Sequence, residues 1–388
     1  MNCNMKRLFT SDIEAVSKCI GTNERNERVI LPSNLYGRIT RISHSACGKN
    51  GTLLSTFEQR RLPEDVEDRL KRQQGHPVFR SDDGGKTWSL SARIINEEHP
   101  DLLTYFMPTI YELPRDVGAF PRGTLLMGGV SGGAEDGSYL QLYVSKDTGR
   151  SWKMLGTLDH GGWGGERGGG TLFFFLLDDN TLVCHYCDER QYKTHSQKLV
   201  YRTTKDLCSW SMLHESVKCS QQSLWPGMPV VTRLPDGRYF MVYEMVGKAG
   251  NQVHCRYSLD SLDWGEVTDE GCIVQTEDGA SLGSSPYCLW VERGSVQGTL
   301  IVSGAFMSNG QSDTGSDYFL SDDLGQTWHQ WPHPIPYSQQ DHASHNGYSN
   351  SYAFSEEDNR FYAICNRGIQ CENRPCTAMT VAICEWVI

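Results

Sequence analysis

The chain has 388 residues, a formal net charge of −11, and 39 glycines, 10 tryptophans and 17 tyrosines. Its acidic balance argues against nucleic acid or an anionic membrane as the main partner. The longest apolar run, residues 172–177, is far shorter than the ~20 residues of a membrane-spanning helix. Many glycines and aromatic residues suit short strands joined by tight turns, and aromatic rings also suit a surface that binds sugars.

The N-terminus has no apolar segment typical of a signal peptide, which predicts a cytoplasmic protein or a trimmed secreted form. The fourteen cysteines have no regular spacing, which favours reduced thiols. Cys184 and Cys187 form a single CxxC without a second pair, so we predict neither a metal nor another cofactor. We expect a monomer.

The first part of the chain predicts a strand that begins at Arg38, a helix over residues 63–72 and a turn at residues 81–88. The turn has the pattern S-x-D-x-G-x-[ST]-W, and we expect Asp83 to accept hydrogen bonds across it. Trp88 would pack back on the hairpin. Arg38 is a candidate substrate-binding residue, with an ordinary surface arginine as the alternative.

A strand predicted at residues 140–144 leads into a second turn of this pattern, at residues 145–152. Residues 160–170 then contain seven glycines together with Trp163 and Glu166. Such a loop is mobile or closely packed. Trp163 could stack on a sugar, and Glu166 is a candidate catalytic carboxylate. A flexible surface loop is the alternative.

Two further β-rich runs end in ionisable groups. Asp188 and Arg190 lie on the same side of an extended chain, where they could pair with each other or contact a sugar hydroxyl. Glu244 ends the apolar run that begins at Tyr239. Burying a carboxylate without a partner is costly, so Glu244 is the strongest catalytic candidate, and a structural salt bridge is its alternative.

The rest of the chain repeats the same turn pattern. Shortened turns of the Asp pattern occur at residues 204–210 and 258–264, and a complete one occurs at residues 321–328. Tyr348 is expected to begin the inner strand of the last blade. Residues 377–388 read as strand throughout.

The five turns start at residues 81, 145, 204, 258 and 321, which is a period of about 60 residues. This spacing predicts an all-β, six-bladed β-propeller in a single domain, residues 1–388, whose last blade is closed by N- and C-terminal strands. The Asp residues of the turns would be structural, and Trp88, Trp152 and Trp328 would lie at the outer rim.

The Asp turns resemble those of the sialidase-like Asp-box (BNR) superfamily. Within it, the chain is similar to the exo-α-1,5-L-arabinanases of glycoside hydrolase family 93. The matching segments are 186–190, 195–200, 226–231, 234–239 and 242–244, with a looser match at 111–114 and 120–126.

This resemblance implies a retaining glycosidase with two catalytic glutamates that acts on an arabinan-like oligosaccharide or polysaccharide. One glutamate matches Glu244. The other normally lies in a Trp-Glu-Pro-Phe stretch, where this chain has Thr171-Leu172-Phe173-Phe174. Either Glu166, or else Glu189, takes that place, or the activity differs.

Two alternatives remain open. A sialidase would use a Tyr nucleophile supported by a Glu, together with three arginines, and Arg38, Arg256, Tyr348 and Glu244 could fill four of these places. A convincing third arginine is missing. The second alternative is a carbohydrate-binding propeller without catalysis. For either enzyme, we expect Glu244 at the axis-facing end of an inner strand beside Tyr348, with a second carboxyl group opposite and Arg38 bonded to a carboxylate or ligand oxygen.

Overall fold

The structure is a computed structural model that describes residues 4–17, 19–22, 28–31, 34–59, 75–102, 104–133, 136–163, 168–338, 346–371 and 374–387. Within these ranges the only helical element is the 3-10 turn η2, Ala249–Asn251. No helix among them is long and apolar enough to cross a membrane. The helix expected at residues 63–72 lies outside the described residues.

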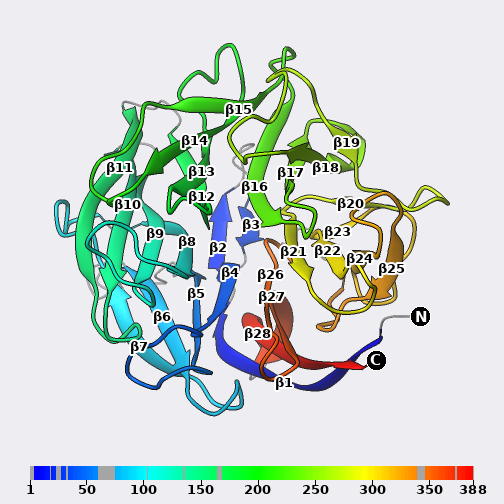
Figure 1. Cartoon of the computed structure of the whole chain (residues 1–388), viewed down its shortest axis with the longest axis horizontal. Helices are drawn as coiled ribbons and strands as arrows, with labels where there is room; N and C mark the ends of the chain where they lie inside the picture. Colours follow the sequence, from blue (N-terminus) through cyan, green and yellow to red (C-terminus); the bar gives the residue numbers. More distant parts are fainter. Residues whose placement is uncertain are drawn as a thin grey trace.

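Six four-stranded antiparallel sheets form six blades, which confirms the predicted propeller (Figure 1). Their strands, from the innermost outwards, are β4 (Asn34–Arg41), β5 (Leu53–Gln59), β6 (His76–Ser81) and β7 (Ser89–Ile94) in blade 1; β8 (Tyr105–Glu112), β9 (Leu125–Gly133), β10 (Asp136–Ser145) and β11 (Lys153–Trp163) in blade 2; β12 (Gly169–Leu176), β13 (Leu182–Asp188), β14 (Lys198–Thr204) and β15 (His214–Lys218) in blade 3; β16 (Trp225–Arg233), β17 (Tyr239–Val246), β18 (Val253–Ser258) and β19 (Cys272–Ile273) in blade 4; β21 (Tyr287–Val291), β22 (Thr299–Ser303), β24 (Asp317–Ser321) and β25 (His329–Pro332) in blade 5; and β26 (Ser351–Ser355), β27 (Arg360–Cys371), β28 (Arg374–Val387) and β1 (Asn4–Ser17) in blade 6.

The innermost strands close a ring around the molecular axis. Each one contacts the innermost strand of the next blade, from β4 through β8, β12, β16, β21 and β26 back to β4. Blade 6 joins the two ends of the chain, because the N-terminal strand β1 pairs with β28 (Figure 1). In the part of the chain that the structure describes, two short hairpins supplement the blades. They are β2 (Cys19–Thr22) with β3 (Arg28–Leu31), and β20 (Ser281–Gly283) with β23 (Phe306–Asn309).

Six hydrophobic clusters hold the ring together, one at each interface between neighbouring blades. Alternate side chains of a strand point to opposite faces, and both faces of every blade are covered by another blade. The middle strands are therefore apolar on both faces. Within β17, for example, Met241 packs toward blade 3 and Val242 packs toward blade 5.

The Asp turns connect the third and fourth strands of blades 1 to 5, as their repeat predicted. In the turn at residues 145–152, Asp147 Oδ1 accepts hydrogen bonds from the Arg150 and Ser151 amides at 3.1 and 2.9 Å, and Oδ2 accepts one from the Ser151 hydroxyl at 2.6 Å. Trp152 Nε1 donates back to the Gly149 carbonyl at 3.2 Å. The same carboxylate bonds recur at residues 81–88 and 321–328. These carboxylates hold hairpins together away from the axis.

We expect Asp147→Ala to lower the free energy of unfolding by about 1–2 kcal/mol, because four donors of the turn, the Ser145 hydroxyl included, lose their acceptor. Urea unfolding would measure this loss. The turn lies at the outer end of blade 2, so kcat of the folded variant on any substrate of the wild type should not change. A marked fall in kcat at full folding would contradict a structural role for the Asp turns.

Candidate active site

The innermost strands share an unusual backbone feature near the axis. Tyr36, Met107, Thr171 and Met228 have positive φ angles of 54°, 48°, 55° and 57°, and each lies within a bulge between the first and second strands of its blade. In blades 5 and 6, Ser284, Ser285 and Ser349 take positive φ just before the first strand. Left-handed backbone at residues other than glycine costs about 1–3 kcal/mol each and clusters at functional sites. The ring of bulges therefore marks the place to look for chemistry.

Glu244 lies at this level of the propeller and is 5% exposed. Its Oε2 accepts hydrogen bonds from Ser284 Oγ at 2.6 Å and from the Ser285 amide at 2.8 Å. Burial raises the pKa of Glu244 above the usual carboxyl value, and the two serine donors oppose that rise. Its Oε1 lies beside Gly227, where an added Cβ would stand 2.8 Å from the oxygen.

Two tyrosines stand beside this carboxylate. The rings of Tyr36 and Tyr348 meet edge to face with centroids 5.3 Å apart. Their hydroxyls share a hydrogen bond, and Tyr348 also bonds the Ser285 side chain. Burial is the main cause that raises the pKa of both hydroxyls, and the Glu244 carboxylate raises both further. Glu244 and Tyr348 therefore share one site, joined through Ser285.

Arg38 is buried on β4, directly after the bulge that contains Tyr36. Its Nη1 donates to the carbonyls of Gly37 at 2.9 Å and Ser349 at 3.2 Å and to Ser349 Oγ at 3.0 Å, and its guanidinium lies 5.7 Å from the centroid of the Tyr287 ring. Burial lowers the pKa of Arg38, and Tyr287 and Tyr36 oppose that shift. No carboxylate of the described residues pairs with it. Among the described residues its acceptors are thus backbone and hydroxyl oxygens, and the alternative that it binds a ligand oxygen stays a prediction.

A second carboxylate, Glu58, reaches the same site from β5 and is 1% exposed. It raises the pKa of Tyr36 and of Tyr348, and its Oε2 accepts a long hydrogen bond of 3.4 Å from the Met107 amide. The axial cluster therefore comprises Tyr36, Arg38, Glu58, Glu244, Ser285 and Tyr348. Tyr36, Glu58 and Ser285 were not among the predicted residues. Glu58 had a weaker signal in the sequence, since it ends the β-rich run Leu53-Leu54-Ser55-Thr56-Phe57, which contains a serine and a threonine that the run before Glu244 lacks.

Three predicted positions need correction. Glu244 lies on β17, the second strand of its blade, and reaches the axis because its partner on the innermost strand is Gly227, which has no side chain to block it. Tyr348 lies in the turn before β26, which begins at Ser351. Arg256 lies on the third strand, β18, and donates to the carbonyls of Ser216, Trp264, Glu266 and Asp269. Its guanidinium ties outer loops together and is not part of the axial cluster.

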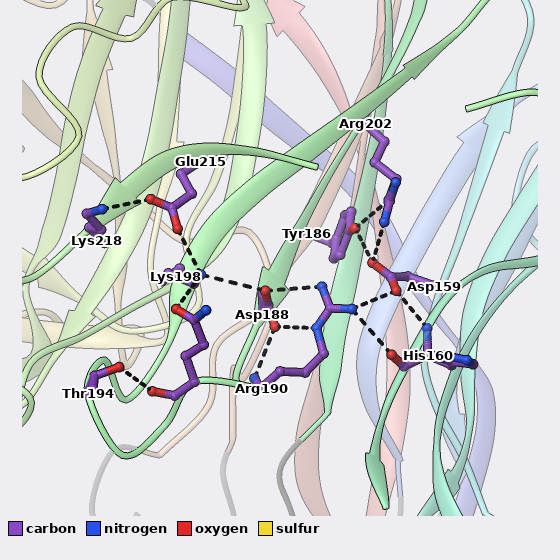
Figure 2. Close-up of polar contacts among 11 residues, drawn as sticks. Asp159, His160, Tyr186, Asp188, Arg190, Thr194, Lys198, Arg202, Glu215 and Lys218 are labelled. Atoms are coloured by element: carbon purple, nitrogen blue, oxygen red, sulfur yellow. Dashed lines mark hydrogen bonds and ion pairs between the residues drawn. The ribbon is translucent and has the colours of Figure 1, made fainter. Parts of the chain in front are cut away.

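Asp188 and Arg190 form a bidentate pair, with Nε to Oδ1 at 2.8 Å and Nη2 to Oδ2 at 3.1 Å. Figure 2 shows that this pair is the centre of an ion network between blades 2 and 3. Asp159 of β11 binds Arg190 at 2.8 Å and Arg202 at 3.2 Å, and Lys198 lies 3.9 Å from Asp188. Lys198 continues the network to Glu215, at 2.8 Å.

Each charged group in this network is paired with a group of opposite charge. Burial alone would raise the pKa of Asp159, but the Tyr186 hydroxyl and the guanidinium groups of Arg190 and Arg202 bring it below its usual value. Asp188 points toward blade 2, while its neighbour Cys187 packs in the cluster between blades 3 and 4. This pattern favours a structural role for Asp188 and Arg190 over the expected contact with substrate. Glu166 lies outside the described residues, as does the side chain of Trp163.

The fit between Gly227 and Glu244 yields a prediction. Gly227→Ala would place a methyl group 2.8 Å from Glu244 Oε1 and 2.9 Å from Gln197 Nε2, which is held by the Pro226 carbonyl. The carboxylate must shift, and we expect kcat/KM to fall by about 100-fold. Gly170 is the equivalent position of blade 3, where the close contacts of the added Cβ are with the flexible end of Met107, and Val130 lies at an ordinary 3.8 Å. Equal losses for Gly170→Ala and Gly227→Ala in a kinetic assay would contradict this account.

Comparisons with known proteins agree with this architecture. The BNR/Asp-box repeat family matches residues 79–90, which include the first Asp turn. A search of curated protein sequences finds no match. The match and the recurring turns identify the chain as a propeller with Asp-box turns, as its repeat predicted.

Several solved structures share the whole fold. An α-L-arabinofuranosidase of Fusarium graminearum, bound to an iminosugar inhibitor, is 26% identical with a TM-score of 0.74, covering 97% of this chain and 98% of that one. An α-L-arabinanase of Penicillium chrysogenum, bound to arabinobiose, is 27% identical with a TM-score of 0.73, covering 95% and 98%. A sialidase of Streptococcus pneumoniae is 10% identical with a TM-score of 0.56, covering 91% and 68%, and shares the fold alone. The fold of this chain is that of glycoside hydrolases.

Proposed function

Because the chain is an Asp-box propeller with the fold of glycoside hydrolases, we propose that it is a retaining glycosidase that cleaves α-1,5-linked L-arabinofuranosyl residues from an arabinan-like glycan. The observation that carries this proposal is the setting of Glu244 in the axial cluster. One oxygen is held by two serine donors, and the other faces the glycine of the innermost strand. Similarity over nearly the whole chain to an α-L-arabinanase supports the choice of sugar.

In this mechanism Glu244 Oε1 attacks the anomeric carbon, and the bond from that carbon to the leaving oxygen breaks. A second carboxyl group gives its proton to the leaving oxygen. The same group then removes a proton from water, which attacks the glycosyl–Glu244 ester and releases the sugar with its original anomeric configuration. The bonds to Oε2 from Ser284 and Ser285 fix the carboxylate so that Oε1 points at its target. Arg38 and Tyr348 would contact the bound sugar.

A sialidase is the second candidate, because Tyr348 stands beside Glu244 and Arg38 is a buried cation at the same site. Arg256 was the second arginine of that hypothesis, and its place among the outer loops weakens it. A propeller that binds sugar without cleaving it would need no second carboxylate at the axis, yet Glu58 is there.

A substrate panel tests the proposal directly. The purified chain is incubated with linear α-1,5-arabinan, arabinobiose, sialyl-lactose and a set of neutral plant glycans, and released sugars are measured by chromatography. We expect arabinose or short arabino-oligosaccharides, with proton NMR showing retained configuration in the first product. Release of sialic acid would favour the second candidate. Saturable binding of arabinan without release of any sugar would favour the binding propeller.

A further inference from the structure

Glu58 and Glu244 occupy the same place in two different blades. Glu58 pairs with Leu35 on the innermost strand of blade 1, and Glu244 pairs with Gly227 on that of blade 4. In both blades the bulge with its left-handed residue follows directly. Blades 1 and 4 are three apart in a ring of six, so they face each other across the axis (Figure 1).

The same backbone contact holds both carboxylates. The Met107 amide donates to Glu58 Oε2, and the Ser285 amide donates to Glu244 Oε2. Met107 and Ser285 are left-handed residues of the next blade in each case, with φ of 48° and 45°. In each of two opposite blades, therefore, a left-handed residue of the next blade donates its amide to a carboxylate near the axis.

Both carboxylates act on one pair of side chains. The rings and the hydroxyl groups of Tyr36 and Tyr348 contact each other. The negative charges of Glu58 and Glu244 both raise the pKa of each tyrosine hydroxyl. Tyr36 directly follows Leu35, the strand partner of Glu58. Tyr348 bonds Ser285, whose amide holds Glu244. The contact between the two rings therefore brings both carboxylates to one site. Carboxyl groups placed on two sides of one bond are the arrangement that glycosidases use.

We propose that Glu58 is the acid and base partner of Glu244, an inference that rests on the glycosidase function proposed above. Two short hydrogen bonds hold Oε2 of Glu244, so that Oε1 is positioned to attack the anomeric carbon, and the transfer of the proton falls to Glu58. Glu58 gives its proton to the departing glycosidic oxygen as the anomeric carbon bonds to Glu244. It then takes a proton from the water that cleaves the glycosyl–enzyme ester. No other reactant is required.

The test uses Glu58→Ala and Glu58→Gln in the full chain. Their activity on linear arabinan should fall by about 100-fold or more, because the sugar leaving group needs a proton. Activity on 2,4-dinitrophenyl α-L-arabinofuranoside or the matching arabinobioside should fall much less in the glycosylation step, because dinitrophenolate leaves without protonation.

Rescue by azide separates the two carboxylates. With Glu58→Ala, added azide should restore turnover of the dinitrophenyl substrate and yield a glycosyl azide of retained configuration, since azide replaces water at the second step. With Glu244→Ala, azide attacks the anomeric carbon itself and the product should have inverted configuration. Proton NMR of the two azides distinguishes them.

Glu112 offers a matched control, because its carboxylate is likewise held by backbone amides, of Ser43 and His44 at 2.8 and 2.9 Å, but it lies at the other end of β8 from Met107. Glu112→Gln should keep wild-type kinetics. If wild-type protein cleaves arabinan and Glu58→Ala does so equally well, the role of Glu58 is overturned while the glycosidase proposal stands. That role is also overturned if Glu166→Ala alone shows azide rescue with retention. If the wild type cleaves no glycan, both proposals fall together.

Discussion

Replacing Glu244 by glutamine should lower kcat/KM on the preferred glycan by about 10⁴-fold or more, while the protein stays folded. Glutamine keeps the shape of the side chain, and its carbonyl oxygen can still accept from Ser284 and Ser285. It cannot form the glycosyl ester, and covalent catalysis offers no alternative path once its nucleophile is lost. Initial rates with arabinan, at enzyme concentrations high enough to detect residual turnover, would measure the effect.

The same substitution should raise thermal stability at neutral pH. Burial raises the pKa of Glu244 in the folded chain above its unfolded value, so folding favours the protonated form. Stability from this group is therefore present at acid pH and lost as the pH rises through the folded pKa. Glu244→Gln removes that loss, and Tm of the variant should exceed that of the wild type at pH 7 and match it near pH 4. Differential scanning calorimetry at both pH values checks the sign.

Full activity of Glu244→Gln would refute its assignment as nucleophile. A variant with lowered Tm at pH 7 would show instead that the ionised carboxylate stabilises the site through its serine donors. The two readouts are independent, because the kinetic effect depends on chemistry and the thermal effect on charge.

Asp188→Asn should have the largest effect on stability, with a loss of about 3 kcal/mol in the free energy of unfolding. The substitution keeps the volume and removes the charge between Arg190 and Lys198, and Lys198 is only 3% exposed. The loss stays at the lower end of the usual range because Asp159 and Glu215 still bind these two cations (Figure 2). Urea unfolding monitored by tryptophan fluorescence would measure it.

Asp179→Asn is the matched control. Asp179 pairs with Lys205 at 3.0 Å on the surface, where the two side chains are 59% and 69% exposed, so its loss should cost less than about 1 kcal/mol. KM for arabinan decides whether Asp188 also binds sugar. A KM unchanged in folded Asp188→Asn supports a structural network, whereas a tenfold rise with little loss of stability would restore the substrate-binding role.

The repeat and its spacing were sufficient to predict the blades from the sequence. The acceptor and the donors of an Asp turn lie within a few residues of each other, as the hydrogen bonds of Asp147 show. The turn can therefore be identified from the sequence alone. Glu244 was also identifiable, because burying a carboxylate at the end of an apolar strand is costly unless it has partners or a function. The signal did not reveal on which strand of the blade it lies.

Only the tertiary structure decided which residues meet. Four residues of the axial cluster come from blades 1, 4 and 6, namely Tyr36, Glu58, Glu244 and Tyr348. Their spacing in the sequence does not indicate that they meet at the axis. The direction of each side chain depends on a bulge that shifts the register by a step, and one such shift turns a strand residue to the other face. Arg256 illustrates the consequence: its residue type suited the site, but the third strand of its blade directs it to outer carbonyls. The chain therefore specifies the propeller through local turns, and assembles its chemistry through contacts between blades that only the closed ring creates.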